Sequence, residues 1–132
     1  MEDCGAIYFD NDNIEKDVYE ILANKGANIA RYRLWHDPKL TNYSNLSDVK
    51  KSIRRAKENG MYVLLDFHYS DTWADPRQQT IPAAWLPYAN NVFRLASELY
   101  DYNYNVLIGL YYLQLTPDIV QLGNEINPMI LQ

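Results

Sequence analysis

The stretch MYVLLDF, residues 61–67, is a nearly continuous apolar run. A run of this kind is typical of a strand buried on both faces, as in parallel sheets covered by helices. The residues before it place Val49, Ile53 and Ala56 at helical spacing, and Gly60 then stands where helices commonly end. The sequence therefore predicts a buried strand that directly follows an amphipathic helix.

Three further segments are predicted to be strands, at residues 5–9, 28–35 and 118–125. Helix-like segments separate the strands, so the order β-α-β-α-β-α-β indicates a parallel sheet with helical crossovers, an α/β fold. A doubly wound sheet and half of a (β/α)8 TIM barrel both fit this order. Because a complete barrel needs roughly 200–250 residues, the chain has room for only the first four β/α units, a half barrel.

The predicted helices carry apolar residues at intervals of three and four. We expect Asn13 to cap the first helix and Gly26 to end it, and we expect Ser47 to cap the second. The third helix begins near Val92 and continues past Leu110, and the sequence after it has no clean stop signal.

Composition narrows the class of protein. With 48% apolar residues the chain has enough to bury a core, and a net charge of -5 argues against nucleic acid or an anionic membrane as a partner. No apolar run is long enough to span a bilayer, and the polar, acidic start does not resemble a signal peptide. Cys4 is alone, so no internal disulfide is expected. Twelve tyrosines permit a carbohydrate site, although most of them are expected simply to pack.

Polar residues recur near the carboxyl ends of three predicted strands. Residues two apart on a strand share a face. The faces with polar residues hold Arg31, Arg33 and Trp35; Leu64, Asp66 and His68; and Gln121, Gly123 and Glu125. Since ligands bind at the carboxyl ends of parallel strands, these side chains are expected to point into the mouth of a barrel.

Two other interpretations of these residues stay open. Arg33, Asp66 and Glu125 also fit a structural ion-pair network, because buried charges persist only when paired. His68 fits a hydrogen-bonded core histidine as well as a sugar ligand. Neither His36 nor His68 has metal-ligand spacing with another histidine, so no metal site is predicted. Nucleotide-binding and serine-hydrolase motifs are absent from the sequence.

Five motifs at and after the predicted strands are distinctive. They are RLW at 33–35, LLDFHYSDTWADP at 64–76, QT at 79–80, PAAW at 82–85 and VQLGNEIN at 120–127. Together they resemble glycoside hydrolase family 53, the arabinogalactan endo-β-1,4-galactanases. The resemblance extends over residues 28–127 and implies that residues 1–132 form the N-terminal half of a single catalytic (β/α)8 barrel domain, truncated after strand four.

The resemblance implies roles for three residues in a retaining mechanism. Glu125 matches the acid/base glutamate that follows an asparagine at the end of strand four. Asn124 would hydrogen-bond the 2-hydroxyl of the sugar in the −1 subsite. Arg33 would lie beneath the site and help to keep the nucleophile ionised.

Four more residues would contact substrate if the resemblance holds. Asp66 and His68 would line the −1 subsite. Trp73 and Trp85 lie in the loop after the 61–67 strand, where aromatic rings stack on galactose. The expected ligand is therefore galactan or arabinogalactan.

A retaining glycosidase needs a second carboxylate about 5–5.5 Å from the first. The family takes this nucleophile from strand seven, and no glutamate here matches its motif, so the isolated chain is expected to be inactive. The alternative is a non-catalytic half barrel that binds sugar or self-associates through its exposed edges. The sequence also departs from the family pattern at residues 109–116 and 128–132.

No cofactor is expected in this part of the barrel. The calcium ligands that some family members use would lie mostly in the other half. The resemblance further implies a secreted parent enzyme, located in the extracellular space or the periplasm.

Overall fold

The computed structural model describes residues 4–131 and contains a three-stranded parallel sheet. Its strands are β1 (Ile29–Leu34), β2 (Tyr62–Phe67) and β3 (Ile119–Leu122), in the order β1-β2-β3. The strands predicted at 28–35, 61–67 and 118–125 are thus confirmed, with shorter bounds. All neighbouring pairs are parallel, as the crossover order requires.

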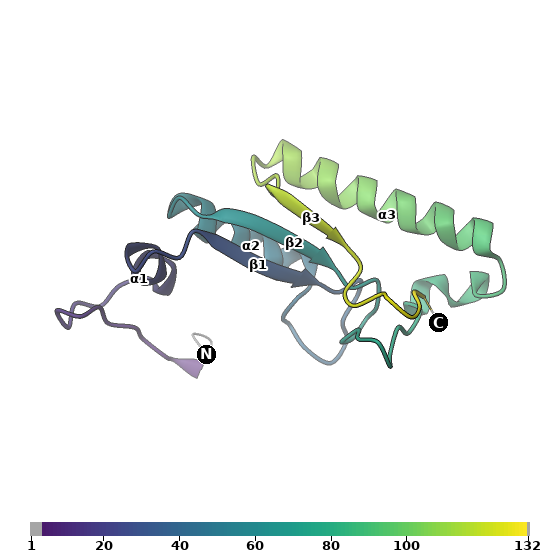
Figure 1. Ribbon diagram of the computed structural model, residues 1–132, viewed down its shortest axis with the longest axis horizontal. Coiled ribbons are helices and arrows are strands. Elements are labelled where there is room, and N and C mark those ends of the chain that lie inside the picture. The colour runs from purple at the N-terminus through teal and green to yellow at the C-terminus, as the bar shows by residue number, and fades with distance from the viewer. Residues whose placement is uncertain (1–3, 132) are drawn as a thin grey trace.

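The helices lie on one side of this sheet. They are α1 (Val18–Asn24), α2 (Leu46–Glu58) and α3 (Val92–Tyr112), and a 3₁₀ helix, η2 (Ala83–Tyr88), precedes α3. Figure 1 shows α2 behind β1 and β2, and α3 running beside β3, so the opposite face of the sheet is open toward the viewer. Among residues 4–131, no helix combines the length and apolarity needed to cross a membrane.

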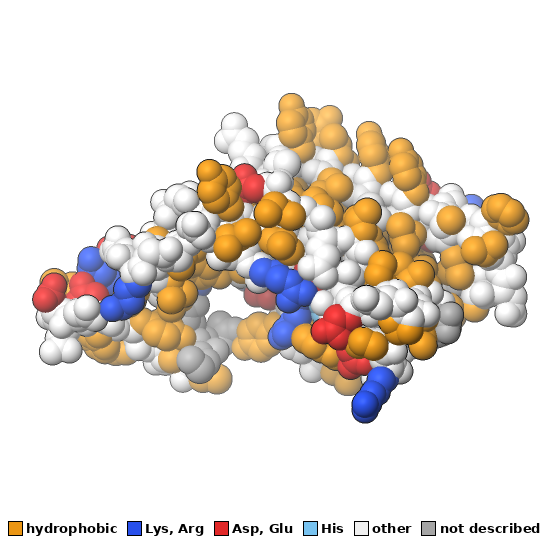
Figure 2. Space-filling model, in the orientation of Figure 1, with side chains coloured by type: hydrophobic (Ala, Val, Ile, Leu, Met, Phe, Trp, Pro, Cys, Tyr) orange, Lys and Arg blue, Asp and Glu red, His pale blue; other side chains and the backbone are white. Residues whose placement is uncertain are grey.

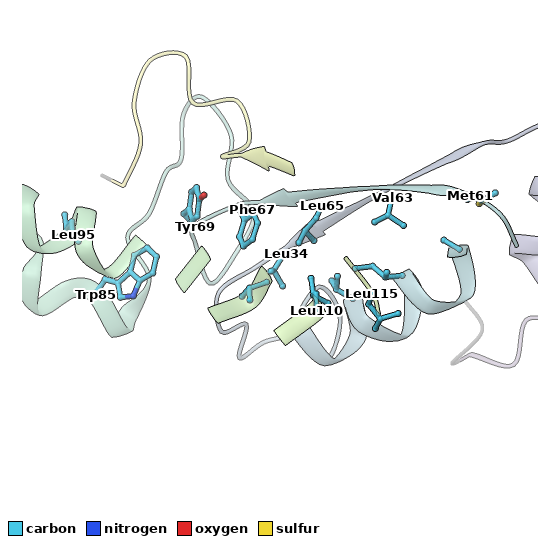
Figure 3. Packing of buried hydrophobic residues seen from close by; sticks show 14 residues of the cluster. Leu34, Met61, Val63, Leu65, Phe67, Tyr69, Trp85, Leu95, Leu110 and Leu115 are labelled. Atoms are coloured by element: carbon cyan, nitrogen blue, oxygen red, sulfur yellow. The ribbon is translucent and has the colours of Figure 1, made fainter. Parts of the chain in front are cut away.

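The core lies between the sheet and α2 and α3. The even-numbered face of β1 contributes Leu34, and the odd-numbered face of β2 contributes Leu65 and Phe67; these pack with Ile53 of α2 and Leu110 of α3. Figure 3 shows Val63, Leu65 and Phe67 pointing from β2 toward the helices. The predicted separation of apolar and polar faces is therefore confirmed for β1 and β2.

The predicted strand at residues 5–9 is wrong. Phe9 forms only an isolated antiparallel bridge with Glu15. The backbone of this segment bonds locally instead: the N–H of Asp10 donates to the carbonyl of Ile14, and that of Lys16 to the carbonyl of Tyr8, both at 3.0 Å. The segment thus forms a local turn, and the outer edge of β1 has no strand partner within residues 4–131.

Two predicted helix caps are also wrong. The side chain of Asp17, not that of Asn13, accepts from the second residue of α1, and Asn45, not Ser47, accepts from the N–H of Asp48 in α2. Asn13 instead adopts a positive φ of 58° in the preceding turn. Each helix begins where a side-chain oxygen reaches a free N–H, and the apolar spacing alone does not locate that point.

All three helices end in the same hydrogen-bond pattern. In α2 the N–H of Gly60 donates to Lys57 and that of Met61 to Ala56, a Schellman motif with glycine in the left-handed conformation. Gly26 is the left-handed residue of the same motif after α1, as predicted. After α3 this left-handed residue is Gln114, with φ 58°. Because it is not a glycine, the sequence showed no stop signal there.

Candidate active site

Asp66, near the end of β2, is a buried carboxylate with two hydrogen-bond partners on one oxygen. Its Oδ2 accepts from Arg31 Nη2 at 2.6 Å and lies 3.1 Å from His68 Nε2. A buried carboxylate needs a cationic or hydrogen-bonding partner, and Arg31 supplies the charge. Its Oδ1 is buried and makes no hydrogen bond with any residue in the described part of the chain.

His68 is buried, and its hydrogen bonds define its tautomer. The backbone N–H of Ala74 donates to Nδ1 at 3.3 Å, so this nitrogen must carry the lone pair. The proton of the neutral ring then sits on Nε2, where it donates to Asp66. Because Asp66 and His68 are both covered, neither presents a polar atom to a ligand, contrary to the expectation that they line the subsite directly.

Asn124 joins three segments at the end of β3. Its Oδ1 accepts from Arg31 Nη2 at 2.8 Å, and its Nδ2 donates to the carbonyl of Ala74 at 2.7 Å. Its own carbonyl accepts from Gln79 Nε2 at 2.9 Å. The buried Asn124 side chain therefore ties the loop after β2 to the end of β3, and one guanidinium nitrogen serves both Asp66 and Asn124.

Glu125 follows directly and is exposed. Its φ of 52° places it in the left-handed region, which costs a non-glycine residue about 1 kcal/mol or more. Within residues 4–131 its carboxylate makes no hydrogen bond or ion pair. The Glu125 carboxylate is therefore accessible to a ligand, and it lies next to an asparagine held by two hydrogen bonds.

Gly123 makes this turn sterically feasible. Its φ is 91°, and a Cβ built there would lie 2.5 Å from Ile126 Cγ2. A side chain would thus both strain the backbone and clash. From the sequence, Gly123 was expected only to share a strand face with Glu125. The structure shows that it instead adopts the left-handed backbone conformation of the turn.

Arg33 contacts aromatic rings rather than Asp66. Its Cζ lies 5.2 Å from the ring centre of Trp73 and 5.6 Å from that of Trp35, and its Nε donates to Ser44 Oγ at 3.2 Å. Trp73 is 42% exposed and packs edge-on against His68, with 5.3 Å between ring centres. Trp73 therefore offers an accessible ring beside the Asp66–His68 pair. Figure 2 shows Lys and Arg side chains in the middle of the face that is turned toward the viewer.

Trp85 is placed elsewhere. It is 3% exposed and packs on His36 and Tyr102, with ring centres 4.9 and 5.8 Å away. Figure 3 shows it at one end of the core beside Leu95. The expectation that Trp85 stacks on a sugar is not supported, because η2 turns the ring inward, away from solvent.

The sequence did not single out Arg31 as a site residue. Arg31 and Arg33 share a face, and Arg33 is the residue paired with Asp66 in the sheet register. The ion pair instead runs diagonally, from Arg31 to Asp66. The proposed structural network of Arg33, Asp66 and Glu125 is therefore wrong in its members: Asp66 is paired, but with Arg31, and Glu125 lies outside the network.

The described part of the chain contains no cluster of three or more His, Cys, Asp or Glu side chains arranged to hold a metal ion. The arrangement at the ends of β2 and β3 is instead one of hydrogen-bond donors, one free carboxylate and an exposed aromatic ring. Such a set can bind neutral hydroxyl-rich ligands and transfer a proton.

Comparison with solved structures defines the class of protein. The chain aligns with a fungal β-1,4-galactanase at a TM-score of 0.89 and 41% identity, over 98% of this chain and 38% of that one. It aligns with the glycoside hydrolase family 53 catalytic domain of Ignisphaera aggregans at 0.87 and 37% identity, with the same coverage. The fold is accordingly part of a TIM-barrel glycosidase domain, as predicted.

The family follows from the sequence profile of glycosyl hydrolase family 53, which matches residues 1–132. The chain belongs to this family. It is 50% identical over 132 residues to an arabinogalactan endo-β-1,4-galactanase of Cellvibrio japonicus. All of this chain but only 35% of that relative is covered, so the chain spans little more than a third of the relative's length.

Proposed function

We propose that this chain supplies the acid/base half of the active site of a retaining endo-β-1,4-galactanase, with Glu125 as the general acid/base. The observation that supports this most strongly is the exposed, unpaired Glu125 directly after Asn124, whose side chain Arg31 and Ala74 hold in place. Two of the named relatives, the Cellvibrio japonicus protein and the fungal enzyme, are β-1,4-galactanases, so the substrate that we assign is the galactan of arabinogalactan.

Glu125 would act twice in each turnover. As an acid it gives its proton to the glycosidic oxygen while a second carboxylate attacks the anomeric carbon, and the bond to the leaving sugar breaks. As a base it then takes a proton from the water that hydrolyses the galactosyl–enzyme bond. The exposed Glu125 carboxylate is accessible for both steps, because no side chain among residues 4–131 occupies its oxygens.

Asn124 and Trp73 would position the sugar. The Nδ2 group of Asn124 carries two hydrogens, and the carbonyl of Ala74 uses one of them. We assign the second to the 2-hydroxyl of the sugar in the −1 subsite. The accessible ring of Trp73 is the stacking surface that we propose, and Arg33 holds it by a cation–π contact. Asp66 and His68 act beneath these residues as positioning groups.

The second carboxylate is proposed to come from the part of the barrel that lies outside the third covered by this chain. Purified chain should therefore release no measurable reducing sugar from β-1,4-galactan, with or without Glu125→Gln. Release that disappears in Glu125→Gln would instead mean that this chain assembles a complete site with another carboxylate.

A chimera, in which this chain replaces the matching part of a relative, tests the proposal in a complete barrel. Residues 1–132 would replace the matching third of the Cellvibrio japonicus galactanase. We expect galactan hydrolysis by this chimera and a loss of about 10²- to 10⁴-fold in kcat with Glu125→Gln. Glu58→Gln, at the end of α2, is the matched control and should leave kcat unchanged. Equal rates for Glu125→Gln and the parent chimera would refute the assignment.

The chemistry proposed for Glu125 uses no cofactor, and chelator treatment of the chimera tests this independently. Calcium bound by other parts of a barrel would show as a loss of stability on chelation, not as a change in the effect of Glu125→Gln. Because polymeric galactan cannot enter cells, we propose that the parent enzyme is secreted to the extracellular space or the periplasm.

A further inference from the structure

The outer side of α3 carries a line of exposed aromatic residues. Phe93, Tyr100, Tyr104 and Tyr111 are 86%, 67%, 56% and 63% exposed. Their spacings of seven, four and seven residues place them within about 40° of one another around the helix, over a length of about 27 Å. The buried residues of α3, such as Leu95 and Val106, lie on the opposite side. Figure 2 shows hydrophobic side chains projecting along α3.

This aromatic stripe is uncharged along its length. The charged residues of α3, which are Asp101 and the Arg94–Glu98 ion pair, lie to one side of it. Tyr100 and Tyr104 already stack on each other, with 6.4 Å between ring centres and 12° between ring planes. An uncharged apolar face of this size on a helix is the kind that packs against another helix.

The stripe is symmetric in sequence. Phe93 and Tyr111 are each nine residues from position 102, and Tyr100 and Tyr104 are each two residues from it. When two copies of α3 pack antiparallel about position 102, Phe93 meets Tyr111 of the second copy and Tyr100 meets Tyr104. A two-fold interface requires such self-complementarity, and a different partner would not.

We propose that the aromatic stripe of α3 is a dimer interface, in which a second copy of this chain packs antiparallel through Phe93, Tyr100, Tyr104 and Tyr111. Phe and Tyr side chains bury about 150–250 Å² each when covered, so eight such rings bury on the order of 1,000 Å². This lies at the low end for specific interfaces.

Sedimentation velocity over a concentration series tests the proposal. The chain should shift from monomer to dimer as its concentration rises. The double variant Tyr100→Glu/Tyr104→Glu should weaken association by about 100-fold, because it places charges at the centre of the contact. Circular dichroism should show an unchanged helix content, since both side chains are exposed and Glu favours helices.

Tyr62→Glu is the matched control, because Tyr62 is an equally exposed tyrosine on the open face of the sheet. It should leave the dimer intact. A dimer lost in Tyr62→Glu and kept in the α3 variant would overturn the proposal and assign association to the sheet. A chain that stays monomeric at every concentration would also overturn it, as would a monomer that binds galactan through the stripe.

Disulfide trapping tests the antiparallel register. In a Cys4→Ser background, Phe93→Cys/Tyr111→Cys should form a covalent dimer on mild oxidation. The two positions lie at opposite ends of α3, so an intramolecular disulfide is out of reach. Phe93→Cys alone should stay uncrosslinked, and rapid crosslinking of that single variant would contradict the antiparallel arrangement.

Discussion

Arg31 is the residue on which the candidate site depends. One of its nitrogens donates to both Asp66 and Asn124, so the same group neutralises a buried carboxylate and orients the amide that precedes Glu125. Its side chain is half exposed, at 49%, while that of Asp66 is fully covered. Because the buried partner is the anion, removal of Arg31 would leave a buried negative charge with only a neutral histidine beside it.

Arg31→Ala should therefore destabilise the fold by about 3 kcal/mol, the lower end for breaking a buried pair. Arg33→Ala is the matched control and should cost less than Arg31→Ala, about 1 kcal/mol, since the exposed Arg33 makes two cation–π contacts and one hydrogen bond to a hydroxyl. Urea unfolding at neutral pH measures both. A larger loss for Arg33→Ala than for Arg31→Ala would contradict this account of the site.

His36 couples stability to pH. Burial between Trp85 and Tyr102 lowers the pKa of His36, and the nearby Asp71 carboxylate opposes this only in part. The unfolded chain, with an ordinary pKa of about 6.5, then binds more protons than the folded chain at mildly acidic pH. Stability should thus fall as pH drops through about 6.5 toward the lower folded value.

His36→Phe should remove this pH dependence, because the ring is kept and the titrating group is lost. Urea unfolding at several values between about pH 7 and pH 5 gives the difference in slope. Asp10 and Asp118, whose pKa values are lowered by backbone hydrogen bonds, act at more acidic pH and leave this window unaffected. Equal slopes for the variant and the parent would show that another group is responsible.

At the scale of single elements, strong apolar periodicity was sufficient to predict α2, α3, β1 and β2. The apolar run MYVLLDF does form a strand, but the expected burial on both faces is incomplete: Val63, Leu65 and Phe67 are buried, whereas Tyr62 is exposed on the open face. The helix starts were not predictable in this way, because Asn45 and Ser47 are both good capping residues two positions apart. Only the backbone conformation of Asn45, extended with ψ 167°, decides between them.

Asn45→Ala should cost about 1 kcal/mol of unfolding free energy, because the N–H of Asp48 loses its acceptor. Ser47→Ala, inside the first turn of α2, should change stability by less than about 0.5 kcal/mol. Thermal or urea unfolding of the two variants compares them directly. The reverse order would mean that α2 begins two residues later than described.

The site itself was only partly predictable from the sequence. Asn124 and Glu125 were identified by the resemblance of their motif, whereas the predicted strand and its alternating face do not reach them, because β3 ends at Leu122 and the chain turns at Gly123. The choice of Arg31 over Arg33 could not be predicted, since both share a face and the ion pair runs across the register rather than along it. The burial of Trp85 could not be predicted from the sequence either, because it depends on how η2 packs against Tyr102.

At the scale of the whole molecule, the helices cover one face of the sheet and leave the other face open (Figure 1). Arg31 and Arg33 of β1 are both exposed. The chain spans 38% of the solved structures it resembles. The open face and the free edge of β1 are where the rest of a barrel would pack. Under the proposed function, Glu125 would face a site to which other strands contribute the second carboxylate.

The central claim, that Glu125 is the acid/base, is tested most directly by azide rescue in the chimera with Glu125→Ala. On an aryl β-galactoside the good leaving group needs no acid, so the galactosyl–enzyme forms and then waits for a base. Azide needs no base, so it should accelerate turnover on the order of tenfold or more and yield galactosyl azide with retained configuration. Turnover that azide leaves unchanged, with no azide product, would contradict the acid/base role of Glu125.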